Sequence, residues 1–259
     1  MKAIKVDLPR SLKHVEIYAL SDLHLGDRNC NYKELLDQVK QIEENKNAYV
    51  ILNGDLINNA TTQSISDTYG ETISPMEQLK QATALFKPIK DKILAITSGN
   101  HENRTYRADG IDLTEIMACE LGLSDRYAPE SVTLFLRVGD KTRKTHKGQQ
   151  VCYVLYITHG SGGGRREGGK INRLVDLSSI IDADIYIHSH THLPAVLKQA
   201  FYRADSKSST IALVDKMFVN TNAWLNYGGY GEANGYKPAS TQTPIIYLDG
   251  SRKKFTAKL

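Results

Sequence analysis

The chain has few cysteines and no long apolar segment, and these two absences exclude several classes of protein. Only three of its 259 residues are cysteine, and they lie far apart at positions 30, 119 and 152. This odd number and wide spacing argue against a disulfide framework and against a zinc site built from thiolates. No run of eighteen apolar residues occurs, and the first ten residues lack the apolar stretch of a secretory signal. We therefore expect a cytoplasmic protein with reduced thiols and no membrane segment.

A large excess of charge of one sign is also missing. The chain has 33 Lys and Arg residues against 29 Asp and Glu, which gives a net charge of +4. This mild excess suits an anionic substrate but is far below that of a protein that coats nucleic acid. With 41% hydrophobic residues and no linker-like stretch, the chain is expected to form one domain over 1–259. The oligomeric state is left open by the sequence.

Five short apolar runs, rich in β-branched residues, each end in an unusual polar cluster. The runs cover 15–20, 49–52, 93–97, 151–157 and 185–187, and each is typical of a buried strand. They lead, in that order, into Ser-Asp-Leu-His-Leu-Gly, Asn-Gly-Asp, Ser-Gly-Asn-His-Glu, Thr-His-Gly and His-Ser-His-Thr-His. Open α/β sheets bind ligands at the carboxyl ends of their strands, so we expect these five clusters to converge.

Helical patterns separate the first of these strands. They cover 32–45, about 75–87 and 112–121, and the second begins with a capping box at Ser74-Pro75-Met76-Glu77. The alternation of strand and helix indicates an α/β fold with a largely parallel sheet. Further β-like runs cover 132–138, 195–201, 211–214, 217–220 and 245–248, and the first of them is expected to pair with 151–157 as a hairpin. The motif-bearing core is thus predicted at about 15–195, followed by a mainly antiparallel β part at 196–259.

The five clusters together offer carboxylate, imidazole and amide groups but no thiolate. The candidate residues are Asp22, His24, Asp55, Asn100, His101, His159, His190 and His192. Such a mixed oxygen and nitrogen set suits manganese, iron, zinc or a similar divalent ion, whereas magnesium normally uses fewer imidazoles. We take manganese as the first choice and keep iron, zinc, nickel and magnesium open.

The number of candidate groups favours two divalent metal ions that share a carboxylate, because eight groups exceed the needs of one four-coordinate ion. Asp55 is alone on its loop and is the natural bridge. Two ions about 3.5–4 Å apart can hold a hydroxide at neutral pH and bind the oxygens of a phosphate. His101 follows the candidate ligand Asn100 and suits a general acid that protonates the leaving oxygen. The pattern therefore predicts hydrolysis of a phosphoester.

Each cluster taken alone also has a structural explanation. Asp22 can cap a helix, Gly54-Asp55 is a common turn after a strand, and His159 can be a loop histidine without a metal. The three alternating histidines of 188–192 are harder to explain in this way, because an extended segment puts all three on one face. The joint pattern favours a site, since all five clusters follow strands and five of the eight histidines are candidates.

In order and spacing these clusters resemble the motifs of the calcineurin-like metallophosphoesterases. That family has five motifs, which are Asp-x-His, Gly-Asp, Gly-Asn-His-[Asp/Glu], His-Gly and Gly-His-x-His. Here they stand as Asp22-Leu23-His24, Gly54-Asp55, Gly99-Asn100-His101-Glu102, His159-Gly160 and Ser189-His190-Thr191-His192. The only departure is Ser189, where the family usually has glycine.

The resemblance implies a fold and a division of the ligands. The implied fold is a sandwich of two sheets flanked by helices, in four layers α/β/β/α. The implied ligands are Asp22, His24, Asp55 and His192 for one ion, and Asp55, Asn100, His159 and His190 for the other. His101 is then the catalytic histidine. His188 matches no ligand of the family, and we interpret it as a structural residue that supports the ligands.

Sequence differences between branches of the family reduce the number of substrate classes to consider. The protein serine/threonine phosphatases follow Gly-Asp with a Val-Asp-Arg-Gly-like run, whereas this chain has Leu56-Ile57-Asn58-Asn59. That difference disfavours a phosphoprotein substrate. The segment Ser21-Asp22-Leu23-His24-Leu25-Gly26 instead resembles the repair-type DNA nucleases and the lipid-precursor pyrophosphatases.

Three arginines are candidates for contacting the substrate. Arg104, Arg165 and Arg166 lie in or just after ligand-bearing loops, where each can bind phosphate or pair with a surface acid. We predict a phosphodiesterase or nuclease that acts on nucleic acid or nucleotides. The alternatives are a phosphomonoesterase for a small phosphorylated metabolite or nucleotide, and a regulatory module that binds metal without turnover.

Two further segments have less certain roles. Tyrosines at 227, 230 and 236 lie among glycines and can stack on a base, although a tyrosine-rich loop more often packs on its own core. The basic stretch Lys141–Lys147 is expected to be a solvated turn between two strands. It would indicate a nucleic-acid backbone as partner only if it faced the site.

Overall fold

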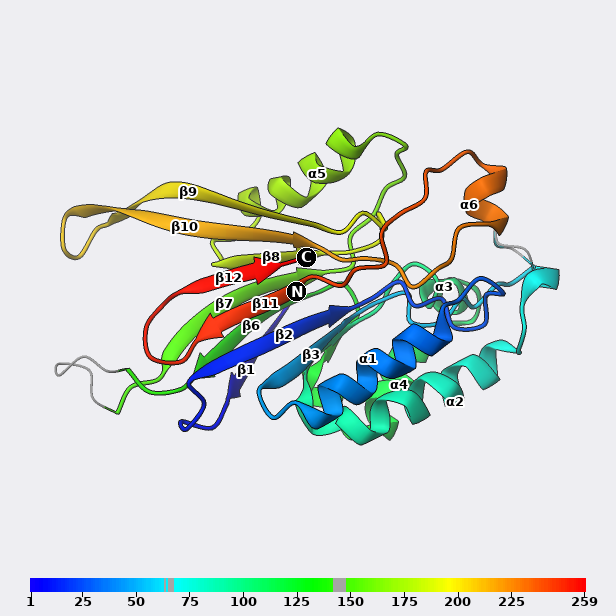
Figure 1. The fold of residues 1–259 in the computed structure, drawn as a ribbon, viewed down its shortest axis with the longest axis horizontal. Helices are drawn as coiled ribbons and strands as arrows, with labels where there is room; N and C mark the ends of the chain where they lie inside the picture. The colour runs from blue at the N-terminus through cyan, green and yellow to red at the C-terminus, as the bar shows by residue number, and fades with distance from the viewer. Residues whose placement is uncertain (63, 65–67, 142–147) are drawn as a thin grey trace.

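The structure is a computed structural model that describes the whole chain except residues 63, 65–67 and 142–147 (Figure 1). The basic turn predicted at 141–147 therefore lies, apart from Lys141, outside the described residues. Within the described part, no helix has the length and apolar character needed to cross a membrane. Cys30, Cys119 and Cys152 are all described and form no disulfide, as their spacing predicted.

Strands and helices alternate through the first half of the chain, and strands dominate the second. The strands are β1 (Lys2–Asp7), β2 (His14–Leu20), β3 (Ala48–Asn53), β4 (Ile93–Thr97), β5 (Tyr127–Ala128), β6 (Ser131–Val138), β7 (Val151–Thr158), β8 (Ile185–His188), β9 (Ala195–Asp205), β10 (Thr210–Asn220), β11 (Ile245–Asp249) and β12 (Phe255–Lys258). The α-helices are α1 (Tyr32–Glu44), α2 (Pro75–Phe86), α3 (Asn103–Asp109), α4 (Leu113–Glu120), α5 (Glu167–Asp176) and α6 (Gly229–Ala233). Short 3₁₀ turns cover Thr68–Gly70, Lys87–Lys92, Ser124–Arg126 and Leu177–Ser179.

The strands form two six-stranded sheets, each with parallel and antiparallel pairs. Their orders are β1-β6-β7-β8-β10-β9 and β12-β11-β2-β3-β4-β5. The expected two-sheet sandwich flanked by helices is confirmed, whereas a largely parallel sheet is only part of the arrangement. β6 with β7 and β9 with β10 are antiparallel, and the segment that joins β9 to β10 is too short for a crossover helix. The two runs predicted at 211–214 and 217–220 are one continuous strand, β10.

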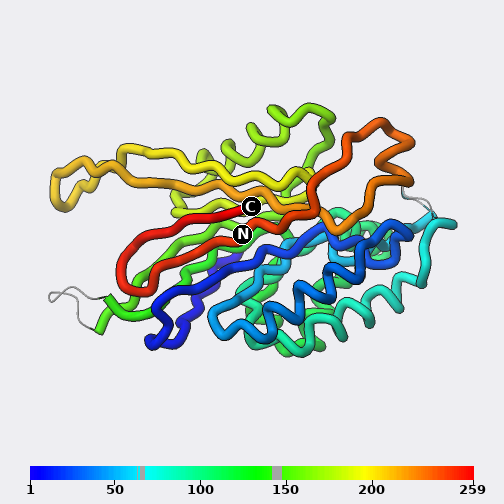
Figure 2. The backbone as a smooth tube through the Cα atoms, in the orientation of Figure 1, coloured from blue at the N-terminus to red at the C-terminus, as the bar shows by residue number. Residues whose placement is uncertain are grey.

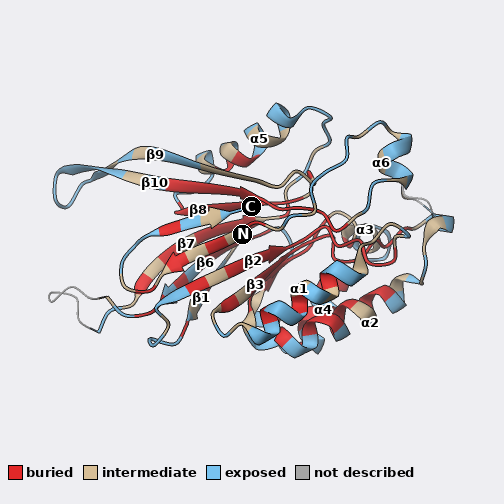
Figure 3. Cartoon of the chain, in the orientation of Figure 1, coloured by how far each residue is buried: buried red, intermediate tan, exposed pale blue. Residues whose placement is uncertain are grey.

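Three apolar layers hold the sandwich together, and buried residues line the facing sides of its elements (Figure 3). Between the sheets lie side chains such as Ile17, Leu134 and Ile187. The second layer joins the β2–β3 side to α1, α2 and α4, and the third joins the β8–β10 side to α5. The two ends of the chain exchange sheets (Figure 2): β1 pairs with β6 in the sheet of the later strands, whereas β11 and β12 extend the sheet of the early strands beside β2.

The predicted helices have the expected starting signals. Asn31 caps α1, which buries Leu35, Val39 and Ile42 on one face. Ser74 and Glu77 form the complete capping box of α2, with Pro75 as its first residue. These local signals were sufficient because they depend only on residues within one turn of the helix start.

The parallel arrangement brings the carboxyl ends of six strands to one end of the sandwich (Figure 1). β2, β3 and β4 are parallel neighbours in one sheet, and β7, β8 and β10 are parallel neighbours in the other. The loops that follow them are joined by backbone hydrogen bonds, such as Asp22 N to Gly54 O at 3.0 Å and Ser189 N to His159 O at 3.1 Å. All the predicted site residues lie in or directly after these loops.

Candidate metal centre

Five of the predicted ligands have a left-handed backbone, which side-chain-bearing residues rarely adopt. Positive φ angles occur at Asp22 (51°), His24 (49°), Asp55 (50°), His190 (66°) and His192 (54°). In the described part of the chain only seven non-glycine residues have positive φ, so the strain is concentrated in this set. Such conformations are unfavourable and persist where the surrounding structure holds them, commonly at functional sites.

The first cluster contains Asp22, His24 and His192. The Nε2 atoms of the two histidines are 3.3 Å apart, and His192 Nε2 lies 3.1 Å from Asp22 Oδ1. Asp22 Oδ1 is buried and accepts no hydrogen bond from the described residues. The other carboxylate oxygen, Oδ2, accepts from Ser21 Oγ at 2.6 Å and from the His190 N–H at 3.2 Å. Two ring nitrogens and a free carboxylate oxygen thus face one point, as metal ligands do.

The second cluster contains Asp55, His159, His190 and Asn100. His159 Nε2 lies 3.2 Å from Asp55 Oδ2 and 3.3 Å from Asn100 Oδ1. Its other ring nitrogen, Nδ1, is 2.7 Å from the Asn53 carbonyl, so it donates there and leaves Nε2 free to bind a cation. His190 Nδ1 is buried and has no hydrogen-bond partner among the described residues.

Asp55 connects the two clusters. Its carboxylate can join a cation site with His159 and His190, and another with His24 and His101. In each of these groups the candidate ligand atoms lie within 4.8 Å of one another. Asp55 is buried, and its Oδ1 accepts the His101 N–H at 2.9 Å. Asp55 thus lies between His24 and His101 on one side and His159 and His190 on the other, and its role as a bridging ligand stays a prediction.

The charges at this centre are those that a cation would balance. Although burial opposes ionisation, neighbouring histidines hold the pKa values of Asp22 and Asp55 below the ordinary value, so both carboxylates are charged. Burial also opposes a charge on His159, but the Asp55 carboxylate raises its pKa to about 10. Burial and His159 lower the pKa of His190 to about 4, which keeps its ring neutral. A protonated His159 thus balances part of this negative charge, and a divalent ion bound beside the two carboxylates would displace that proton.

His101 lies beside the centre with its two ring nitrogens in different surroundings. Nδ1 is 2.7 Å from the Asn58 carbonyl, whereas Nε2 is 3.8 Å from Asp55 Oδ2 and 3.0 Å from Arg104 Nη2. The Arg104 guanidinium is anchored to the carbonyls of Asn58 and Asn59 at 2.9 and 3.3 Å. Burial, assisted by this guanidinium and opposed by Asp55, lowers the pKa of His101.

Glu102, to which the sequence assigned no role, joins two of the ligand loops. Its buried carboxylate accepts the N–H groups of Asp55, Leu56, Ile57 and Gly99 at 3.0, 2.6, 3.1 and 2.9 Å. Burial and the nearby Asp55 charge raise the pKa of Glu102 to about 7, against the pull of these donors. The carboxylate thus shapes the left-handed turn that presents Asp55.

A Glu102→Gln variant is expected to be markedly less stable. The amide can accept only through one oxygen, so two of the four N–H groups lose their acceptor, and each loss costs about 1–3 kcal/mol. The free energy of unfolding should therefore fall by about 2–6 kcal/mol in urea titrations of metal-free protein. Glu44→Gln, at the exposed end of α1, is the matched control. A loss no larger than that of the control would contradict the role of Glu102.

A sixth polar segment, Asn220-Thr221-Asn222, follows β10 and was missed. Thr221 Oγ1 lies 2.6 Å from Ser21 Oγ, which in turn holds Asp22. Asn220 Oδ1 is 2.8 Å from His188 Nδ1, and its amide donates to Thr191 Oγ1 at 2.7 Å. His188 belongs to none of the candidate cation groups, and it supports the ligand loop as we interpreted it. The signal was a polar triplet directly after an apolar strand, the same pattern as in the other five loops.

The remaining predicted substrate residues occupy the rim rather than the centre. Of the three arginines, Arg104 is the one whose guanidinium contacts His101. Arg165 and Arg166 are exposed on the loop before α5. From that helix, Lys170 Nζ donates to the Thr191 carbonyl at 2.8 Å, which attaches the start of α5 to the loop of His190 and His192.

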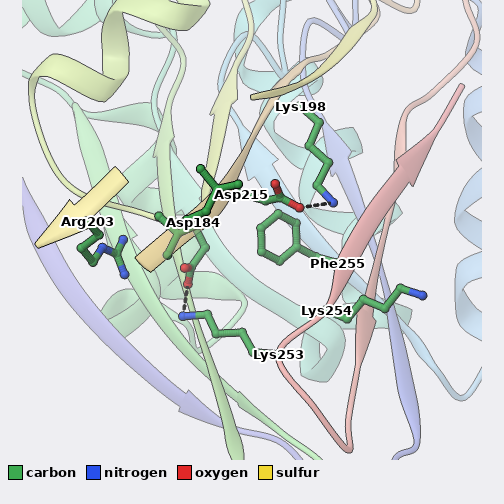
Figure 4. Close-up of a pocket in the computed structure, with 9 residues that line it drawn as sticks. Asp184, Lys198, Arg203, Asp215, Lys253, Lys254 and Phe255 are labelled. Carbon is green, nitrogen blue, oxygen red and sulfur yellow. Dashed lines mark ion pairs between the residues drawn. The ribbon is translucent and has the colours of Figure 1, made fainter. Parts of the chain in front are cut away.

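A separate cavity of about 380 Å³ lies near the start of β8, at the opposite end from His188 (Figure 4). Residues of the β9–β10 hairpin and of the segment leading into β12 line it. Two of its lysines are paired with carboxylates, Lys198 with Asp215 at 2.7 Å and Lys253 with Asp184 at 2.8 Å. It contains none of the predicted site residues and is distinct from the candidate metal centre.

A protein-family model and a solved structure resemble this chain. The model of the calcineurin-like phosphoesterase family matches residues 15–194, which include every candidate ligand. Among solved structures, a conserved uncharacterised protein from Streptococcus pneumoniae, described as a predicted phosphoesterase, is similar at 16% identity. The match covers 95% of this chain and 90% of that one, with a TM-score of 0.39. A comparison with curated proteins finds no match.

Proposed function

Because this chain belongs to the calcineurin-like phosphoesterase family, we propose that it hydrolyses phosphodiesters with two divalent metal ions. The position of Asp55 carries the proposal, since candidate ligand atoms of His24, His159 and His190 all lie within 4.8 Å of its buried carboxylate. Asp22, His24, Asp55 and His192 would hold one ion. Asp55, Asn100, His159 and His190 would hold the other, and manganese suits this mixture of oxygen and nitrogen ligands.

The protein side chains have distinct tasks in the proposed reaction. A pair of divalent ions supplies an activated water and neutralises charge on the phosphate. His101 donates through Nδ1 to Asn58, which leaves Nε2 facing Asp55 to deliver a proton to the leaving oxygen. The Arg104 guanidinium, held 3.0 Å from that nitrogen, is placed to bind a phosphate oxygen next to the leaving group.

Arg104 also fixes the state of His101 before substrate binds. A guanidinium only donates, so His101 Nε2 accepts from it and carries no proton in this arrangement. A phosphate oxygen that attracts the guanidinium would release Nε2 to take up a proton. His101 would thereby gain its proton when a substrate is present.

Nucleic acid or a nucleotide is the proposed substrate class. The net charge of +4, the position of Arg104 in α3 beside His101, and the exposed Arg165 and Arg166 before α5 support a substrate with more than one anionic group. The likeness of 21–26 to repair-type nucleases supports the same class. A phosphomonoester remains the main competing substrate, because the ligand set alone does not distinguish the two.

Hydrolysis of a substrate panel tests this proposal. Single-stranded DNA, duplex DNA, RNA, cyclic nucleotides and p-nitrophenyl mono- and diesters should be assayed with added Mn²⁺ at two salt concentrations. We expect turnover of diesters, and for a polymer a steep loss of binding with salt as several phosphates release counterions. Activity confined to monoesters would overturn the diester assignment. No turnover of any ester by metal-loaded protein would instead indicate a regulatory module.

A further inference from the structure

Two loops at the rim of the metal centre bring aromatic rings beside a guanidinium. The segment at 226–237, which is a loop apart from the short helix α6, follows Trp224, whose backbone N–H donates to the Asp22 carbonyl at 3.0 Å. The rings of Tyr230 and Tyr236 in this loop are stacked, 6.2 Å apart at an angle of 28°. Arg165, on the loop that follows His159, places its guanidinium 6.0 Å from the centre of the Tyr236 ring. We call Tyr230, Tyr236 and Arg165 the aromatic platform.

The platform is attached to the loop that carries His190 and His192. Lys237, next to Tyr236, forms an ion pair with Glu167 in the first turn of α5 at 2.5 Å. One helical turn further, Lys170 donates to the Thr191 carbonyl. The segment that carries the platform and the loop that carries His190 and His192 are thus both held by the start of α5. Tyr227 Oη donates to the Tyr236 carbonyl at 3.1 Å and braces the loop from its other side.

The tyrosines of this loop do not pack on the protein's core. Tyr227 is 52% exposed and Tyr230 54% exposed, and none of the three belongs to the apolar layers found among the described residues. The usual reason for a tyrosine-rich loop, packing on its own core, therefore does not apply. Tyr236 is half-buried beneath the exposed Tyr230 ring, and aromatic rings exposed outside the core are typical of a binding surface.

We propose that the aromatic platform binds an unpaired nucleobase of the substrate whose phosphate lies at the metal centre. This inference rests on the proposed function. Every base presents a flat π-face that stacks on aromatic rings, and the planar guanidinium of Arg165 adds a cation–π contact. A base within a duplex already stacks on its neighbours and cannot reach such a surface. The platform therefore selects single strands or nucleotides over duplex.

A comparison of ligands with and without a base tests the platform without turnover. Binding of thymidine 5′-monophosphate and of deoxyribose 5-phosphate should be measured by calorimetry on the metal-loaded protein. We expect the nucleotide to bind about tenfold more tightly, and Tyr236→Ala to abolish that difference. Tyr236→Phe, which keeps the ring, should retain it. Tyr202→Ala, which removes an 81%-exposed tyrosine from β9, is the matched control and should also retain it.

The same contrast should appear in the reaction. For a thymidine dinucleotide, Tyr236→Ala should raise KM about tenfold and leave kcat unchanged, whereas an abasic dinucleotide should show no change. Equal affinity of the unaltered protein for ligands with and without a base would overturn the platform and leave the phosphodiesterase intact. Absence of any diester hydrolysis would overturn the proposed function, and the calorimetric difference would still decide whether a base is bound.

Discussion

An Asp55→Asn variant is expected to lose both metal ions and, with them, nearly all activity. The asparagine keeps one oxygen but removes the negative charge between the two groups of histidines, so neither ion would retain its shared ligand. Replacing a residue that only supports a ligand costs 10–100-fold in metal affinity as a rule, so a shared ligand should cost more than about 100-fold. Elemental analysis after dialysis and phosphodiester assays with limiting Mn²⁺ measure both effects.

The control for Asp55→Asn is an aspartate that faces solvent. Asp109→Asn, at the exposed end of α3, makes the same chemical change and should leave metal content and rate unaltered. Circular dichroism would show that the variant remains folded, because the asparagine oxygen can still accept the His101 N–H. Two metal ions per chain in purified Asp55→Asn would contradict the bridging assignment.

A His101→Ala variant is expected to keep both metal ions and lose about 10²–10⁴-fold in rate, the usual contribution of a positioned acid. His101 is close to the centre, but its Nδ1 is used by Asn58 and its Nε2 is 3.8 Å from Asp55. The loss should be smallest for p-nitrophenyl esters, because a good leaving group needs no proton. Rates with esters of increasing leaving-group pKa, compared between the variant and the unaltered protein, measure this dependence.

The matched control for His101→Ala is His14→Ala, which removes an exposed histidine at the start of β2. It should change neither metal content nor rate. If His101→Ala lost one metal ion, the residue would be a ligand and the acid would have to be sought elsewhere. A rate loss of equal size for all leaving groups would also refute proton donation and would indicate a role in binding the phosphate.

Local sequence patterns were sufficient to predict the strands that lead into the five polar clusters and the helices α1, α2 and α4, but not β1, β5 or β12. An apolar β-branched run reports burial on both faces, and the polar residue after it marks the end of the strand. Because Asp22, Asp55 and His159 each follow such a run, their convergence followed from the general geometry of α/β sheets. The capping box at Ser74 is local for the same reason, since its partners lie within one turn.

Contacts between distant parts of the chain could not be predicted from local sequence patterns. Ser21 and Thr221 are 200 residues apart, yet their hydroxyls meet and hold Asp22. Glu102 accepts hydrogen bonds from N–H groups of a turn more than forty residues earlier. The hydrophobic periodicity of the sequence does not indicate which N–H groups need such an acceptor. The burial of such groups requires partners, but the sequence does not say which ones.

The sequence by itself determined which groups are available for metal binding and for proton transfer, because residue type and position after a strand suffice for that. Only the tertiary structure decided that Asp55 lies between two groups of histidines and that the Arg104 guanidinium contacts His101. It also decided that Tyr227 and Tyr230 are exposed to solvent. The physical reason is that pairing between strands remote in the sequence brings the carboxyl ends of those strands together. The orientation of each side chain there depends on hydrogen bonds that residues remote in the sequence supply.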